Sequence, residues 1–333
     1  MTKLKDIKGT KIQYLDSDPA NPIVGQMWFN STSSTLKGYG LASTTTGSWS
    51  SGGNLNTAGA FGGGFGIQTA AVYATRYSPA GQQGIVESYN GSSWTEVNDV
   101  NTARRELGSF GTQTAGLICG GRPPNGLAIT ESYNGTNWTE VNDMNTGRSE
   151  AQSNWGTQTS GVFATGYTTT NVTNAETWDG TSWTEVADVN TARQYATGIG
   201  GNNTSGLCIG GSESLTNVES WNGSSWTETT EINTGRGTLG GAGVATLGIV
   251  YGGSAPSPSP TSRAQTEFWN GSSWTEVADM ATARYSPGSA KNGTSTSALA
   301  IGGVAPPYTA ATEEWTVDNA VVTVTTSYYL TIN

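Results

Sequence analysis

The sequence predicts an all-β protein in which six copies of a four-stranded unit close into a ring. A motif recurs five times: Glu, a residue that is Ser or Thr in four of the five copies, an aromatic residue, an Asn-Gly or Asp-Gly turn, Trp, Thr and Glu. Its tryptophans are separated by 44, 45, 43 and 48 residues: Trp94, Trp138, Trp183, Trp226 and Trp274. Low charge (12%) with many Gly, Thr and aromatic residues is typical of short strands joined by turns.

Charge is unevenly distributed along the chain. The net charge is −10, but residues 1–37 hold five Lys and three Asp, so the remainder carries −12. An acidic body without a basic stripe argues against nucleic acid or an anionic membrane as a partner. No apolar run approaches the roughly 20 residues of a membrane helix. The N-terminus lacks the apolar stretch of a signal peptide, so we expect synthesis in the cytoplasm without Sec export.

The residues best suited to metal or redox chemistry are scarce. The sequence has no His, which removes the commonest metal ligand and general base. Cys119 and Cys208 fall in equivalent strands of two units, where we expect small buried hydrophobic residues rather than a disulfide. No loop shows the ligand-dense spacing of a calcium site. We expect no metal and no cofactor.

The chain begins with a short module over residues 1–40. Residues 25–30 alternate like a strand, residues 31–34 read as a turn, and residues 35–39 read as a second strand. This pattern predicts a β-hairpin with Trp28 and Leu36 as its apolar anchors.

Residues 41–318 contain the repeats, and each repeat reads as four strands. The first strand follows a Thr-Ala/Gly-Arg element, the second ends near a Gly pair, the third ends in Glu-x-aromatic, and the fourth carries the recurring Trp. The turn between the third and fourth strands is Asn-Gly or Asp-Gly, which favours a hairpin because it needs positive φ. The first copy has Gly59 where the others have Arg, and two copies replace the Gly pair with Thr75-Arg76 and Thr165-Gly166.

The ring is expected to close through the N-terminal end of the array. The Glu-x-aromatic element occurs a sixth time at Trp315 without a recurring Trp after it, whereas Trp49 stands alone before the first strand. Trp49 therefore supplies the missing fourth strand of the last unit, giving a six-bladed β-propeller whose sheet edges are protected. Residues 319–333 alternate like one extra strand or tail outside this count.

The recurring arginines are interpreted as structural. They occur once per unit in fixed register, each five residues after an acid: Arg104, Arg148, Arg193, Arg236 and Arg284. Repetition indicates ion pairs or backbone contacts, because a catalytic set comes from unlike positions. The adjacent Glu313 and Glu314 point to opposite faces of a strand and are poor acid–base partners. We expect no enzyme.

Function is expected where the copies differ. The loops between second and third strands differ in every unit and share one face of the ring, where binding residues usually lie. Tyr and Arg are favoured anchors in such patches. We nominate one residue from each of five loops: Tyr77, Arg122, Tyr167, Arg263 and Tyr308. A second candidate set varies within the first strands and is expected to line the central channel: Arg105, Glu106, Glu150, Gln194, Tyr195 and Tyr285.

The Gly pair, Glu-x-Tyr-Asn, the spacing to Trp and the Arg before the first strand together resemble kelch repeats over about residues 48–318. That resemblance implies a propeller that binds proteins or glycans. Residues 18–32 with Leu36 and Lys37 resemble a short module near the start of tailed-phage structural proteins, especially those of marine phages. This second resemblance implies attachment to other virion proteins, for which we nominate Trp28, Phe29 and Leu36.

The sequence therefore favours a non-enzymatic virion protein on the tail or capsid surface. It would be tail fibre, tail-associated or capsid-decorating, and its variable loops would bind a host-surface glycan or protein or a neighbouring virion protein. A bacterial kelch-like binding module is the alternative, and a glycan hydrolase is a third.

Overall fold

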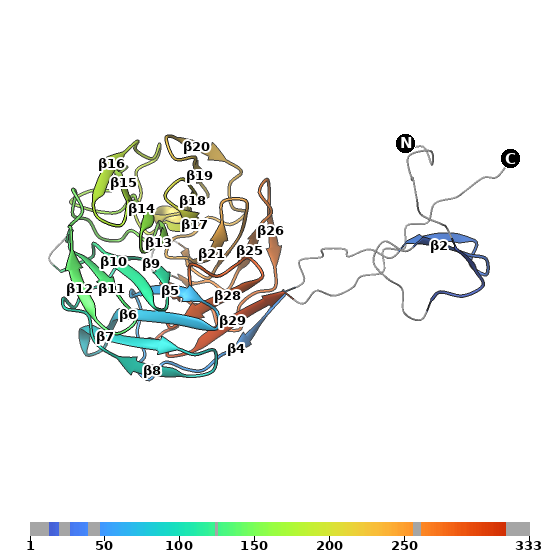
Figure 1. The fold of residues 1–333 in the computed structure, drawn as a ribbon, viewed down its shortest axis with the longest axis horizontal. Helices are drawn as coiled ribbons and strands as arrows, with labels where there is room; N and C mark the ends of the chain where they lie inside the picture. Colours follow the sequence, from blue (N-terminus) through green and yellow to red (C-terminus); the bar gives the residue numbers. More distant parts are fainter. Residues whose placement is uncertain (1–12, 20–26, 39–46, 124–125, 256–260, 318–333) are drawn as a thin grey trace. The chain divides into compact units, whose positions relative to one another are not determined.

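A computed structural model describes residues 13–19, 27–38, 47–123, 126–255 and 261–317. The chain divides into two units, one of residues 47–316 and one of residues 1–46 with 317–333. The larger unit is a six-bladed β-propeller of small antiparallel sheets, as predicted (Figure 1). The described residues contain no helix with the length and apolar character needed to span a bilayer.

Each blade contains four strands, ordered outward from the axis, and we number the blades along the chain. Blade 1 contains β5 (Gly63–Ile67), β6 (Ala70–Ser78), β7 (Gly81–Tyr89) and β8 (Trp94–Val97). Blade 2 contains β9 (Gly108–Thr112), β10 (Ala115–Cys119), β11 (Thr130–Tyr133) and β12 (Trp138–Val141). Blade 3 contains β13 (Asn154–Thr157), β14 (Ser160–Ala164), β15 (Ala175–Trp178) and β16 (Trp183–Val186).

Blade 4 contains β17 (Thr197–Asn202), β18 (Ser205–Ile209), β19 (Val218–Trp221) and β20 (Trp226–Thr229). Blade 5 contains β21 (Gly240–Val244), β22 (Leu247–Tyr251), β25 (Thr266–Trp269) and β26 (Trp274–Val277). Blade 6 contains β27 (Gly288–Ser289), β28 (Ser297–Ile301), β29 (Thr312–Val317) and β4 (Gly47–Ser51). Short elements in the loops are the 3-10 turn η2 (Ser212–Ser214) and the pair β23 (Ser254–Ala255) and β24 (Thr261–Ser262).

Blade 6 closes the ring as the sequence predicts. Strand β4 pairs with β29, and the Gly52 amide donates to the Thr312 carbonyl over 2.9 Å. The rings of Trp49 and Trp315 lie 5.6 Å apart between centroids. The innermost strands β5, β9, β13, β17, β21 and β27 contact one another in a complete circuit. Two segments separated by the whole propeller sequence thus form one sheet, which leaves no unpaired end blade.

The recurring tryptophans join each blade to the one before it. Within a blade, Trp lies opposite the aromatic residue of the third strand, as Tyr133 and Trp138 do at 4.7 Å. Its indole N–H then donates to the preceding blade: Trp138 to the Asn98 carbonyl over 3.1 Å, and Trp49 of blade 6 to the Thr266 hydroxyl over 3.0 Å. Trp94 completes the circle by donating to Thr312 over 3.1 Å. The repeated Trp therefore packs and hydrogen-bonds the interface between blades.

A buried ion pair lies in every blade. The glutamate of each Glu-x-aromatic element accepts from an arginine and from two backbone amides of the segment that leads into the same blade. In blade 3, Glu176 pairs with Arg148 at 2.7 Å and accepts from the amides of Asn145 and Thr146 at 2.8 and 3.2 Å. The pairs in blades 2 to 6 are Arg104–Glu131, Arg148–Glu176, Arg193–Glu219, Arg236–Glu267 and Arg284–Glu313. The arginines are structural, as predicted, and their partner is this glutamate.

Blade 1 reaches the same arrangement by exchanging two positions. Gly59 stands where the other blades have Arg, and Arg76 stands where most have the second Gly of the pair. Arg76 is fully buried, pairs with Glu87 at 2.6 Å and donates to the Thr57 carbonyl. A Cβ at Gly59 would lie 2.9 Å from the Arg76 side chain, so Arg76 occupies the space that the missing arginine would fill. Arg76 thus compensates for the absence of an arginine at position 59.

The first unit contains the predicted hairpin with one further strand. β2 (Met27–Asn30) pairs antiparallel with β3 (Thr35–Gly38), and β1 (Gln13–Leu15) pairs parallel with β2. Trp28 is buried at 1% exposure and its indole donates to Asp18 over 2.9 Å. Phe29 is half-buried and stacks on Tyr14, whose side chain is 76% exposed. Trp28 therefore belongs to the module's core, and its outward aromatic surface is Tyr14 with Phe29.

Two other expectations concern the cysteines and the tail. Cys119 and Cys208 are free and buried in hydrophobic clusters, as expected, and burial raises the pKa of the Cys119 thiol. The predicted extra strand at 319–333 lies outside the described residues.

The exchange in blade 1 yields a double-mutant prediction. Arg76→Gly leaves the Glu87 carboxylate buried without its cation and should lower the free energy of unfolding by about 3 kcal/mol. Gly59→Arg alone collides with Arg76 and should also destabilise the protein. The double variant rebuilds the arrangement of the other blades, so we expect it to be clearly more stable than Arg76→Gly in urea unfolding. Additive losses in the double variant would contradict the exchange.

Candidate functional site

The two faces of the propeller differ in kind. The short turns between first and second strands and those between third and fourth strands share one face, which we call the turn face; Gly135 of one such turn lies against Thr114 of the other. Asn-Gly turns recur there because the Asn side chain accepts from two backbone amides, as Asn90 does from Ser92 and Ser93. Strand β29 ends and β4 begins where the other blades have this turn. The variable loops lie on the opposite face, which we call the loop face.

Six residues form a hydrogen-bonded ring around the axis on the loop face. Each stands two positions after the arginine of its blade, or after Gly59 in blade 1, and each has a left-handed φ between 49° and 62°: Phe61, Glu106, Glu150, Tyr195, Thr238 and Ser286. The amide of each donates to the carbonyl of the equivalent residue in the preceding blade, over 2.6 to 3.4 Å. A left-handed non-glycine residue costs roughly 1 kcal/mol, so the closed ring holds six strained residues in place.

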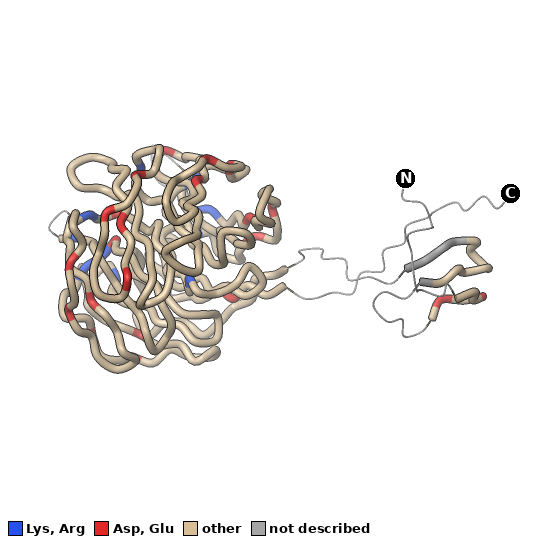
Figure 2. Tube along the Cα trace, turned by 45° about the horizontal axis from the view of Figure 1, so that its top comes forward, with Lys and Arg blue, Asp and Glu red and all other residues tan. Residues whose placement is uncertain are grey.

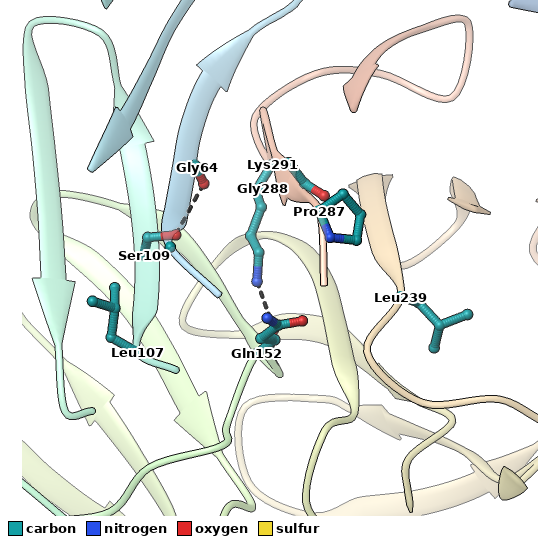
Figure 3. Close-up of a pocket in the computed structure, with 10 residues that line it drawn as sticks. Gly64, Leu107, Ser109, Gln152, Leu239, Pro287, Gly288 and Lys291 are labelled. Atoms are coloured by element: carbon teal, nitrogen blue, oxygen red, sulfur yellow. Dashed lines mark hydrogen bonds between the residues drawn. The ribbon is translucent and has the colours of Figure 1, made fainter. Parts of the chain in front are cut away.

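The axis beneath this ring is filled. Lys291, in the turn that follows β27, extends between the inner strands and donates to the Gln152 carbonyl over 2.5 Å (Figure 3). It also donates to the Asn154 carbonyl and to Asn154 Oδ1, at 3.1 and 2.9 Å. Between Lys291 and the ring lies a cavity of about 10 Å³ lined by Leu107, Ser109, Leu239 and Pro287 among others. That volume holds about one water molecule. The expected central channel is therefore closed to any larger ligand.

Aromatic side chains from blades 1 and 6 gather beside the ring. Tyr77 and Tyr308 meet edge to face with centroids 6.0 Å apart, and Phe61 and Tyr285 do so at 6.2 Å. Tyr285 lies close enough to Tyr308 to influence its ionisation. The Arg105 guanidinium lies over the Tyr77 ring at 4.5 Å. All of these side chains are half-buried, so each keeps an accessible part.

A charged network continues from Arg105 across blades 2 to 4. Arg122 holds Glu106 through two nitrogens, at 2.5 and 2.8 Å, and Glu150 through a third at 3.0 Å. Tyr195 hydrogen-bonds to Glu150. Burial raises the pKa of Glu150, and the nearby Glu106 adds to the effect while Arg122 opposes it. Arg122, which is 25% exposed, thus bridges two carboxylates that are 4% and 6% exposed, and Arg105 adds a longer contact to Glu106 at 3.5 Å.

Together these nine side chains form what we call the mouth cluster: Phe61, Tyr77, Arg105, Glu106, Arg122, Glu150, Tyr195, Tyr285 and Tyr308. The structure brings three of the five nominated loop residues into it, namely Tyr77, Arg122 and Tyr308. Tyr167 takes the position of Tyr77 and Arg122 in blade 3, where it pairs with Ser149, and Arg263 lies in the loop of blade 5. Among the described residues, the contacts that join the cluster include neither of them.

The set proposed for the channel lining is at the mouth instead. Arg105, Glu106, Glu150, Tyr195 and Tyr285 belong to the cluster because the backbone turns at the ring before the inner strand begins. Sequence reasoning missed Phe61, since its copy lacks the arginine that marks the position. Counting two residues on from Gly59 finds it.

The three residues nominated for attachment differ in their positions within the first unit. Trp28 is in the core of its own sheet, Phe29 contributes to the surface with Tyr14, and Leu36 lies opposite Phe29 in the strand pairing. Their role in attachment stays a prediction.

Charge elsewhere on the propeller is mostly acidic (Figure 2). The outer strands expose acids at repeated positions: Glu96, Glu140, Glu185, Glu228 and Glu276. No group of three His, Cys, Asp or Glu suited to a metal ion occurs within the residues that the structure describes.

The charged network predicts a pH-dependent loss on removing Arg122. Arg122→Gln leaves Glu150 without its cation and Glu106 with only the longer contact to Arg105, and should lower the free energy of unfolding by roughly 2 to 3 kcal/mol at pH 7. A carboxyl with a raised pKa in the folded state contributes stability at low pH and loses it as pH rises through that pKa. The deficit relative to the unmodified protein should therefore be smaller at pH 4.5 than at pH 7 in urea unfolding. An equal deficit at both pH values would reject the network.

Lys291 predicts the opposite pH trend. Burial lowers the pKa of Lys291 to about 7, below its value in the unfolded chain. The protonated form is thus penalised on folding, and stability should rise with pH above about 7 by about 1 to 2 kcal/mol up to pH 9. Lys291→Met should lack this rise, so the difference between the two unfolding free energies should change across that range. A constant difference would show that Lys291 titrates normally.

A scan against protein-family models and a search of curated proteins each found no match for this chain.

Proposed function

We propose that this protein is a non-enzymatic binding component of a virion, attached through its first unit and binding a partner through the loop face of the propeller. The mouth cluster is the observation that carries the binding half of the proposal. Nine side chains from five blades meet there around a ring of strained backbone, and equivalent positions carry different residues from blade to blade. The turn face, in contrast, repeats nearly the same short turns. Strained, non-repeated residues on a rigid scaffold are typical of binding sites.

The path of the chain is consistent with attachment on the side of the turn face and binding at the loop face. The chain enters the propeller at β4 and leaves it at β29 on the turn face, opposite the mouth cluster. The module resemblance and the exposed pair of Tyr14 and Phe29 support attachment through the first unit.

A non-enzymatic role is supported by what the site contains. The paired carboxylates Glu106 and Glu150 are buried and held by Arg122, so neither is placed to act on a substrate. A bacterial kelch-like binding module is the second candidate. It shares the mouth cluster but makes no use of the first unit.

Particle composition tests the proposal. Mass spectrometry of purified particles should find the full chain in stoichiometric amount. Tyr14→Ala with Phe29→Ala removes the module's aromatic surface and should reduce incorporation about tenfold, since each aromatic contact contributes about 0.5 to 1.5 kcal/mol. Tyr77→Ala, on the loop face, should be incorporated normally. Absence of the unmodified chain from particles would reject the virion assignment and leave the cellular module.

A further inference from the structure

We infer that the mouth cluster binds a neutral glycan chain laid across the end of the propeller axis. This inference rests on the proposed function, because it names the chemical class of the partner for the same loop face. Three features of the mouth cluster support a neutral glycan: its shallow shape, its balanced charge and its aromatic surface.

Among the described residues, the site is a surface above a small cavity. The ring of six residues and Lys291 leave a cavity of about 10 Å³ below the mouth, enough for one water molecule. Small-molecule sites enclose about 300 to 1,000 Å³. A ligand at the mouth must therefore lie over the cluster, as an extended polymer does.

The charges of the cluster cancel. Arg105 and Arg122 are matched by Glu106 and Glu150, and the closest pairs lie at 2.5 to 3.5 Å. The guanidinium groups already have carboxylate partners, so they offer no free fork to a sialic acid, uronic acid or phosphate. The acids likewise have their cation. The cluster can therefore offer a ligand hydrogen bonds from polar groups that together carry no net charge. Such groups match the hydroxyl groups of sugars.

The apolar part of the cluster is aromatic and amphipathic. Tyr77, Tyr285 and Tyr308 present half-buried rings with hydroxyl groups at their tips, and Phe61 extends this shelf. Among the described residues, the exposed large hydrophobic side chains of the propeller are Ile67, Val244 and Leu247, all on the turn face. Rigid phenol rings beside polar groups fit the flat, hydroxylated faces of sugar rings.

The test uses the purified full chain on an array that carries neutral hexose oligosaccharides together with sialylated and uronic-acid glycans. We expect binding to a neutral oligosaccharide, unchanged between about 0.05 and 0.5 M salt because no ion pair is made. The double variant Tyr77→Ala and Tyr308→Ala should lower the affinity at least about tenfold, as expected for two lost aromatic contacts. Ile67→Ala on the turn face is the matched control and should bind as the unmodified protein does. Circular dichroism and unfolding confirm that each variant is folded.

Binding of labelled protein to host cells separates the failure of this inference from that of the proposed function. Loss of cell binding after periodate treatment of the cells, and in the double variant, supports a glycan. Loss after protease treatment but not periodate, again abolished in the double variant, means that the mouth binds a protein; the glycan inference then fails and the proposed function stands. If the protein instead binds acidic glycans selectively and in a salt-sensitive way, the inference that the glycan is neutral fails and the proposed function stands. If the double variant binds cells as well as the unmodified protein, the glycan inference and the binding half of the proposed function are both wrong.

Discussion

A buried glutamate in each blade is the interaction on which the rest of the propeller depends. Its carboxylate joins the third strand to an arginine and to two amides of the segment that leads into the same blade, as Glu176 does with Arg148, Asn145 and Thr146. Because a buried carboxylate without its cation costs several kcal/mol, the segment has one favourable path. Two residues beyond the arginine the backbone reaches the axis, so the six ion pairs also determine where the mouth residues emerge.

The same constraint explains how a repetitive scaffold produces a site that is not repeated. The ring around the axis uses only main-chain amides and carbonyls, so its side chains are free to differ while φ stays left-handed in all six blades. The ring positions carry Phe61 in blade 1, Glu106 and Glu150 in blades 2 and 3, Tyr195 in blade 4, Thr238 in blade 5 and Ser286 in blade 6. Lys291 fills the axis from the other side, which leaves the loop face as a closed surface.

Much of this architecture could be predicted because its causes are local or periodic. The Asn-Gly turns, the alternation of the hairpin, the spacing of tryptophans and the unmatched Trp49 and Trp315 each follow from short segments or from counting. The role of Arg76 could not be predicted, since it replaces an arginine 17 positions away along the chain by filling the same space from a neighbouring strand. The burial of Trp28, whose indole donates to Asp18 in the segment after β1, likewise became visible only in the structure, and its role in attachment stays a prediction.

The sequence alone determined the all-β class, the six blades, the closure through the N-terminal strand and the structural nature of the repeated arginines. In a repeat, both the number of copies and the missing elements can be counted along the chain. Only the tertiary structure decided which variable residues meet. Tyr77 and Tyr308 lie more than two hundred positions apart and touch because the ring closes between blades 6 and 1, whereas Tyr167, in an equivalent loop, has no part in the cluster among the described residues. Contact between blades depends on the geometry of closure, which no local pattern encodes.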